Sequence, residues 1–210
     1  MHPYFTRLGV RPEVQRFFRP FYDVDDIGNL QFAYGEDWEH FGFAFHKVPV
    51  TDQLWLAGNL QLSQVRLVVL SASALEAVAW LNKKLPRFPQ MENVLFASLG
   101  AGISDGQLLW IKEHLAGKQY HLLFGNDLLG RIADLKLAAA IRGWPLSAFL
   151  AEKEEVIVEF RSRQFSFVQE NFSLFAFEKS AGVRFGMATD KPKSLNTYFA
   201  ELKARAGLLA

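Results

Sequence analysis

The middle of the chain alternates apolar runs with segments of helical periodicity. Residues 65–70 are dominated by valine and leucine, as expected of a strand that is buried on both faces. Residues 73–85 place apolar side chains at 74, 75, 77, 78 and 81, which is the spacing of a helix with one buried face. The alternation continues with strands at 93–99 and 120–124 and helices at 105–115 and 128–141. This order predicts a parallel sheet with right-handed crossovers.

The N-terminal part, residues 1–60, is predicted to open with a helix and to continue with strands. Pro12 suits the first turn of a helix at residues 12–18. The first twenty residues are also basic, because only Glu13 opposes their four arginines. These arginines are Arg7, Arg11, Arg16 and Arg19. The strands are predicted at residues 30–34 and 41–45.

The C-terminal part, residues 148–210, changes to short strand-like stretches and a closing helix at residues 196–206. Ala181 and Gly182 suit a hairpin turn between the last two strands. The four strands are predicted at 156–160, 164–168, 174–178 and 183–187. With residues 61–147 between these parts, the chain is predicted to be an α/β protein. Its parallel sheet is flanked by helices and by smaller N- and C-terminal parts that contain β-strands.

Composition limits the classes of protein that remain. Half of the 210 residues are hydrophobic and 20 are phenylalanine, which is enough for a sizeable core. The formal charge of +1 means that any nucleic-acid surface is a local patch rather than an overall field. The absence of cysteine excludes disulfides, thiolate zinc sites and cysteine nucleophiles. No apolar run approaches the ~20 residues that cross a bilayer, and no signal peptide is recognisable, so we expect a soluble cytoplasmic protein.

Two segments at the ends of predicted strands carry the most specific pattern. Residues 68–78 read VVLSASALEAV and residues 124–131 read FGNDLLGR. They resemble the two signature stretches of the Toprim domain, the metal-binding core of bacterial-type primases, topoisomerases and some nucleases. In that family the first stretch ends its strand on a glutamate, and here this position is Ala72. The second stretch carries two aspartates one residue apart, and here these positions are Gly125 and Asp127.

The resemblance implies a Toprim-like parallel sheet and the loss of its chemistry. In the family the glutamate acts in proton transfer and the aspartates hold Mg²⁺, a hard cation that needs several oxygen ligands. Alanine and glycine offer no side-chain oxygen. Residues 193–198 also resemble a Lys-Asp-x-Asn segment of mobile-element Toprim proteins, with Ser194 at the aspartate position. The resemblance therefore extends over most of the chain, but several positions that are acidic in the family carry non-acidic residues here.

The vestigial site comprises Ala72, Glu76, Gly125 and Asp127, and three residues in or near it have two interpretations each. Asp127 is either a relic metal ligand or the N-cap of the helix at 128–141. Glu76 either stands in for the lost glutamate or completes a capping box that starts at Ser73. Arg131 meets either a phosphate at the sheet edge or a surface carboxylate. His40 and His46 lie near Glu36, Asp37 and Glu39, without a recognisable metal-ligand spacing.

A second basic feature lies in the C-terminal part. Arg161, Arg163, Phe165 and Phe167 would share one strand face, because side chains alternate along a strand. Basic groups beside aromatic rings suit single-stranded nucleic acid, where bases stack and phosphates pair. The alternative is a half-buried strand with its arginines at the rim.

The sequence therefore predicts a catalytically degenerate Toprim/primase-like protein with a binding or scaffolding role in nucleic-acid metabolism, in a mobile element. No catalytic residue and no cofactor is expected; Mg²⁺ is the one metal ion that the sequence leaves open. The expected partners are single-stranded DNA or RNA, a protein partner or a second copy of the chain, and no membrane. One alternative is a protein–protein module that assembles through the phenylalanine-rich C-terminal part. Another is an active site relocated to Asp127, Glu76 and Asp134.

Overall fold

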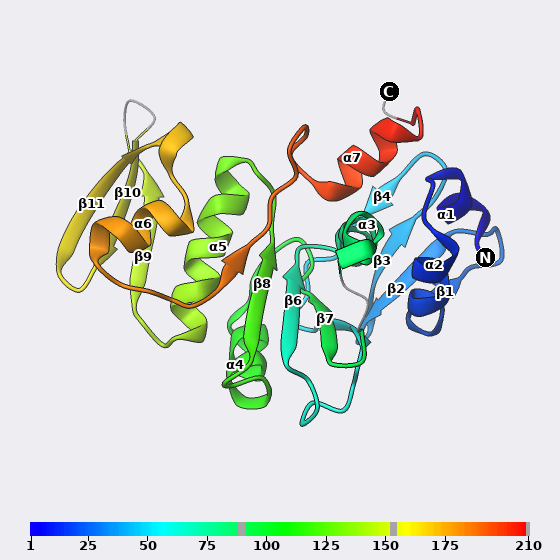
Figure 1. Cartoon of the computed structure of the whole chain (residues 1–210), viewed down its shortest axis with the longest axis horizontal. Coiled ribbons are helices and arrows are strands. Elements are labelled where there is room, and N and C mark those ends of the chain that lie inside the picture. Colours follow the sequence, from blue (N-terminus) through cyan, green and yellow to red (C-terminus); the bar gives the residue numbers. More distant parts are fainter. Residues whose placement is uncertain (88–90, 152–154, 209–210) are drawn as a thin grey trace.

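The protein is described by a computed structural model over residues 1–87, 91–151 and 155–208. Three sheets follow one another along the molecule, as Figure 1 shows. An N-terminal antiparallel sheet lies at one end, a mostly parallel five-stranded sheet lies in the middle, and a C-terminal antiparallel sheet lies at the other end. The predicted α/β fold, a helix-flanked parallel sheet with β-containing parts on both sides, is confirmed. No helix in these three ranges is long and apolar enough to cross a membrane.

The N-terminal part packs two short helices on a four-stranded sheet of order β1-β2-β3-β4. The helical elements are α1 (Pro3–Arg7), α2 (Pro12–Phe18) and the 3₁₀ turn η1 (Arg19–Phe21). The strands are β1 (Asp23–Val24), β2 (Leu30–Tyr34), β3 (Asp37–Phe41) and β4 (His46–Lys47). The predictions of a helix at 12–18 and a strand at 30–34 are confirmed.

The predicted strand at residues 41–45 is wrong, because the chain turns after Phe41. The Gly42 amide donates to the Phe45 carbonyl at 3.0 Å and closes the turn between β3 and β4. A Cβ on Gly42 would lie 2.4 Å from Asn29 Oδ1 and 2.5 Å from the Phe45 ring, so a larger residue here would require these side chains to move. The alternation of phenylalanine with small residues here belongs to a turn with exposed rings and not to a strand.

The central sheet has the order β12-β8-β6-β7-β5, and only β5 runs antiparallel to its neighbour. All six predicted elements between residues 65 and 141 are present, with bounds that shift by at most a few residues. The strands are β5 (Trp55–Gly58), β6 (Leu67–Ser71), β7 (Val94–Ser98), β8 (Gln119–Leu123) and β12 (Ala188–Thr189). The helical elements are α3 (Ala74–Lys84), η2 (Leu85–Arg87), α4 (Asp105–His114) and α5 (Leu128–Ile141).

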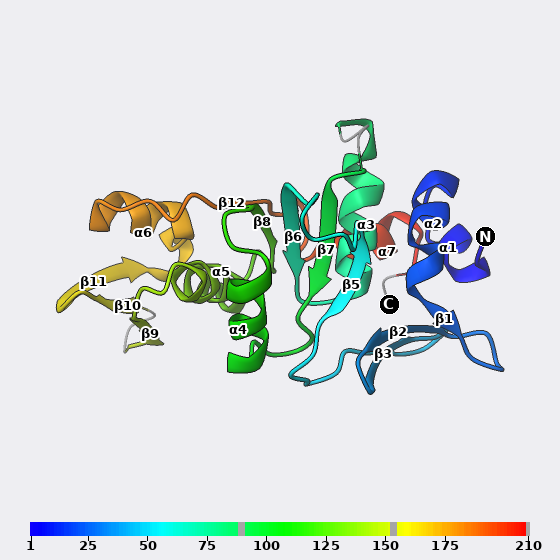
Figure 2. The ribbon, with the colours of Figure 1, turned by 90° about the horizontal axis from the view of Figure 1, so that it is seen from below.

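This sheet separates two hydrophobic cores. One core joins α3, the N-terminal part and the C-terminal helix α7 (Tyr198–Arg205), and the other joins α4, α5 and the C-terminal sheet (Figure 2). Strand β6 feeds both cores, since Val69 packs into the first while Val68 and Leu70 pack into the second. Burial on both faces explains why its sequence is apolar without alternation.

The C-terminal part differs from its prediction over residues 174–187. Residues 174–178 begin a helix, because Ser173 Oγ accepts from the Ala176 amide at 3.1 Å and caps it. Gly182 ends this helix in the left-handed region, with φ of 68°, instead of making a hairpin turn. Residues 183–187 form no strand. The elements are β9 (Leu146–Leu150), β10 (Glu155–Phe160), β11 (Arg163–Val168), η4 (Gln169–Asn171), α6 (Leu174–Ala181) and α7.

Candidate functional site

The carboxyl ends of β6 and β8 form a crevice on the central sheet. The two strands are parallel neighbours, but α3 follows β6 onto one face of the sheet and α5 follows β8 onto the other. Connections that diverge in this way leave a crevice at the carboxyl ends of the strands. A pocket of about 320 Å³ lies there, and both Ala72 and Gly125 line it. We call this pocket the switch-point cleft; it brings together the two positions that the sequence analysis paired.

Asp127 caps α5. Its Oδ1 accepts a hydrogen bond from the Gly130 amide at 2.8 Å, so the predicted N-cap is present. A Cβ on Gly130 would lie 2.1 Å from the Gly125 carbonyl oxygen, so only glycine allows the start of α5 to approach this loop so closely. Asp127 is the one acidic residue among residues 124–131. Its carboxylate is committed to the helix start.

A lysine ammonium occupies the end of β8. Lys191 Nζ donates to the Phe124 and Gly125 carbonyl oxygens at 2.9 and 3.0 Å and lies 2.5 Å from Asp134 Oδ2. Asp134 is buried, and its Oδ1 has no hydrogen-bond partner among the described residues. Burial raises the pKa of Asp134 to about 7, although the neighbouring ammonium acts in the opposite direction. Burial likewise lowers the pKa of Lys191, against the pull of Asp134.

Glu39 of β3 is a carboxylate of this region that the sequence analysis did not assign. It is fully buried, and it caps α3 by accepting from the amides of Ala74 at 2.7 Å and Leu75 at 3.3 Å. It also accepts from the Tyr34 hydroxyl at 2.8 Å and pairs with His46 Nε2 at 2.8 Å. Its inward direction follows from strand alternation, but nothing local in the sequence indicates that it meets a helix start 35 residues away.

Glu76 caps a distant helix rather than its own. Ser73 Oγ accepts from the Glu76 amide at 3.1 Å, which is one half of the predicted capping box. The Glu76 carboxylate turns instead to α7 and accepts from the amides of Tyr198 and Phe199. Burial raises its pKa to about 7, against the effect of these two amides. The prediction that Glu76 completes its own capping box is therefore wrong.

The acidic groups around the switch-point cleft are thus bound to helix starts or to a lysine. Over the described ranges of the chain, no group of three or more His, Asp or Glu side chains is placed to hold a metal ion. A relocated site of Asp127, Glu76 and Asp134 would require these carboxylates to leave their present partners.

Arg131 joins the first turn of α5 to the C-terminal part. Its guanidinium donates to the carbonyl oxygens of Glu170 at 2.8 Å and Phe172 at 3.3 Å, and to Asn126 Oδ1 at 3.3 Å. All three acceptors are neutral oxygens. The guanidinium group therefore neither pairs with a surface carboxylate nor stays free for a phosphate, which were the two interpretations of Arg131.

The basic and aromatic residues of β11 lie close to the predicted arrangement, with one exception. Arg161 lies in the turn before β11 with φ of 51° and covers the Phe160 and Trp144 rings, so it does not share the strand face. Arg163 lies 5.0 Å from the centre of the Phe165 ring. Phe165 and Phe167 pack against Phe177 of α6, at 5.5 and 6.3 Å between ring centres. The helix thus covers one side of both rings.

A second, basic pocket lies where α3 and α7 meet the connection between α1 and α2. Its volume is about 430 Å³, and its lining includes Arg7, Arg11, Lys83, Glu201 and Arg205. Glu201 pairs with Lys83 at 2.5 Å. Burial acts to raise the pKa of Glu201, but Lys83 and two backbone amides outweigh it and hold this pKa at about 2. The charge of Lys83 is therefore compensated.

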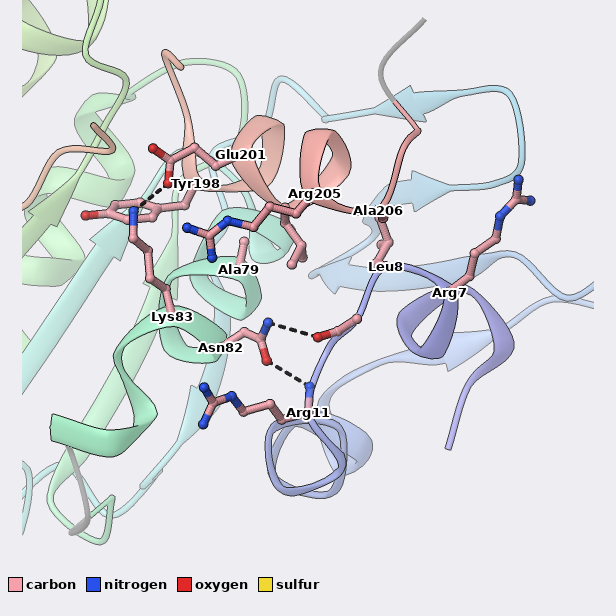
Figure 3. Close-up of a pocket in the computed structure, with 12 residues that line it drawn as sticks. Arg7, Leu8, Arg11, Ala79, Asn82, Lys83, Tyr198, Glu201, Arg205 and Ala206 are labelled. Carbon is pink, nitrogen blue, oxygen red and sulfur yellow. Dashed lines mark hydrogen bonds and ion pairs between the residues drawn. The ribbon is translucent and has the colours of Figure 1, made fainter. Parts of the chain in front are cut away.

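The three arginines of this basic pocket are not compensated. Arg7, Arg11 and Arg205 are exposed, and no ion pair or side-chain hydrogen bond holds their guanidinium groups within the described chain. Figure 3 shows Arg11 and Arg205 on either side of Asn82, whereas Arg7 points away from them. Asn82 accepts from the Arg11 amide at 2.8 Å and donates to the Gly9 carbonyl at 3.2 Å, which fixes the α1–α2 connection against α3.

Comparisons with protein-family models, with curated proteins and with solved structures find no match to this chain. The fold and the site define the class of protein: an α/β protein with a mostly parallel central sheet, a switch-point cleft whose carboxylates are bound internally, and a separate basic pocket.

Proposed function

We propose that this chain is a degenerate Toprim/primase-like protein that binds nucleic acid without metal-dependent phosphoryl transfer. The observation that carries the proposal is the contact of Lys191 Nζ with the Gly125 carbonyl oxygen at 3.0 Å. Gly125 stands where the resemblance expects a metal-binding aspartate. The Lys191 ammonium group already uses the carbonyl oxygens of Phe124 and Gly125, so a divalent cation at this point would have to displace it to gain these oxygen ligands.

Nucleic-acid binding is supported by the uncompensated arginines of the basic pocket. The chain has a formal charge of only +1, so three free guanidinium groups at one pocket are a local concentration of positive charge. Arginine binds phosphate oxygens through paired N–H donors. A nucleic-acid backbone supplies several phosphates in series and releases counterions when they are neutralised.

The first experiment measures fluorescence anisotropy of labelled single-stranded DNA and RNA at low salt, with and without Mg²⁺. We expect binding that weakens as salt rises and is the same without Mg²⁺. Arg11→Ala/Arg205→Ala should weaken binding and reduce the salt slope, whereas the exposed Arg184→Ala is the matched control. Absence of binding at low salt would contradict the nucleic-acid role. Mg²⁺-dependent primer synthesis or cleavage by the unaltered protein would contradict degeneracy.

Rebuilding the acidic site tests the metal argument separately. Ala72→Glu/Gly125→Asp returns the two carboxyl groups, and Lys191→Met removes the competing ammonium. We expect Mn²⁺ binding by calorimetry only when all three changes are combined. Equal Mn²⁺ binding by the unaltered protein would show that its cleft already accommodates a divalent cation.

The second candidate is an assembly module, which exposed apolar residues of the C-terminal sheet favour. Leu150 and Val168 are 55% and 53% exposed and lie at the same end of this sheet, on opposite faces, because their partners on β10 are adjacent residues. Sedimentation velocity distinguishes this function. A stable oligomer that Leu150→Lys/Val168→Lys dissociates, with no oligonucleotide binding, would favour assembly over nucleic-acid binding.

A further inference from the structure

The turn between β3 and β4 holds two exposed aromatic rings. Phe43 is 75% exposed and Phe45 is 48% exposed. Their neighbour Phe41 instead packs against Tyr4 and Phe199, at 5.8 and 5.3 Å between ring centres. The turn is fixed by the Gly42–Phe45 hydrogen bond, so the two rings project from an anchored base.

These rings line a third pocket, of about 400 Å³, which adjoins the basic pocket. Arg7 and Leu8 line both pockets, and the Arg7 guanidinium lies 5.4 Å from the centre of the Phe43 ring. Arg7 points away from Arg11 and Arg205 in Figure 3, and its contact with Phe43 shows where it points. The exposed rings of the third pocket therefore lie next to the arginine side chains of the basic pocket.

The same pocket continues to the switch-point cleft on its other side. His46 and Lys203 line both of them. The three pockets thus form one series, from the basic pocket through the aromatic pocket to the cleft, with Arg7 at the first junction and Lys203 at the second. A ligand that fits this series carries repeated negative charges and flat apolar groups at short intervals.

We propose that the turn at residues 42–45 stacks the bases of a single-stranded nucleic acid whose phosphates lie along Arg7, Arg11 and Arg205. This inference rests on the proposed function and names the surface and the ligand class for it. A single strand has free base faces that stack on exposed rings, whereas the bases of a duplex are already stacked on each other. Charge complementarity favours a nucleic acid as the ligand of this surface, because an apolar protein segment would leave the three guanidinium groups without anionic partners.

The experiment uses the full chain with three fluorescent probes of equal length: a single-stranded DNA, the corresponding duplex and an abasic single strand. The test variant is Phe43→Ala/Phe45→Ala. The control is Phe175→Ala, which removes a ring that is 67% exposed on α6. We expect the test variant to bind the single strand about tenfold more weakly with an unchanged salt slope, and the abasic strand equally well. The control should bind all three probes like the unaltered protein.

Each outcome separates this inference from the function on which it rests. Equal single-strand binding by the test variant, or duplex binding by the unaltered protein as tight as single-strand binding, overturns base stacking and leaves the proposed function standing. Failure of the unaltered protein to bind any probe at low salt overturns both. Thermal unfolding of the test variant checks that the removed rings are not needed for folding.

Discussion

Glu76 Oε2 accepts a hydrogen bond from the Phe199 amide at 3.0 Å, which joins the first turn of α3 to the first turn of α7 across 123 positions of sequence. Helix α7 contributes lining residues to the basic pocket, to the aromatic pocket and to the switch-point cleft. The geometry of all three therefore depends on how firmly α7 is attached. The Glu76 carboxylate therefore acts as a structural anchor for α7.

Removing this anchor should destabilise the protein. Glu76→Ala leaves the two buried amides of α7 without acceptors, so we expect the free energy of unfolding in urea to fall by about 2 kcal/mol. Glu113→Ala, an exposed glutamate on α4, is the matched control and should change it little. Similar losses of unfolding free energy in both variants would show that the Glu76 cap of α7 does not stabilise the protein.

The same carboxyl group should make stability depend on pH. Its pKa is about 7 in the folded protein because of burial, above the ordinary value of 4.5. Between these values the folded state binds more protons than the unfolded state, so this group's contribution to stability increases as pH falls from 7 toward 4.5. As the pH falls over this range, we therefore expect the unfolding free energy of the unaltered protein to rise relative to that of Glu76→Gln. A difference between the two that is constant with pH would refute the assignment.

The buried pair of Lys191 and Asp134 should show strong coupling. Lys191→Met leaves the Asp134 charge buried without its cation and should cost about 3 kcal/mol of stability. Lys191→Met/Asp134→Leu removes both charges and should recover most of that loss. A double-mutant cycle in urea measures the coupling, and additive single effects would mean that the two side chains do not interact.

The close contact between Gly130 and the Gly125 backbone gives a steric test. In Gly130→Ala the new methyl group would meet the Gly125 carbonyl oxygen at 2.1 Å, so the start of α5 must shift. We expect a loss of about 2 kcal/mol in unfolding free energy. Gly102→Ala is the control, because a Cβ there meets nothing within 4 Å. If both variants unfold alike, the approach of α5 to the loop is looser than described.

Much of the fold was predictable because it depends on neighbouring residues. The helix at Leu128–Ile141 was predicted with its bounds, since Asp127 caps it through an amide only three residues away. The turn at residues 41–45 and the helix α6 were missed, although the Gly42–Phe45 hydrogen bond and the Ser173 cap are equally local. Short runs such as 174–178 fit both strand and helix periodicity, and the choice is made by the caps at Ser173 and Gly182 and by packing on β11.

The candidate site was predictable in position but not in chemistry. Strand ends in a parallel sheet indicated that Ala72 and Gly125 meet, and both line one cleft. The basic character of the first twenty residues was also visible. Which of their arginines remain uncompensated was not, because that depends on the partners that the fold places within reach. Arg16 lies 3.9 Å from Glu13 and Arg19 donates to the Tyr22 carbonyl, whereas no ion pair holds Arg7 or Arg11 within the described residues.

The sequence by itself determined the central β-α-β alternation and the loss of side-chain oxygens at Ala72 and Gly125, because periodicity and residue identity are local properties. Only the tertiary structure decided that Glu39 caps α3, that Glu76 caps α7 and that Lys191 lies on the Gly125 carbonyl. These contacts join residues from 35 to 123 positions apart. Such pairs form because buried polar groups require partners, and folding determines which partners are within reach.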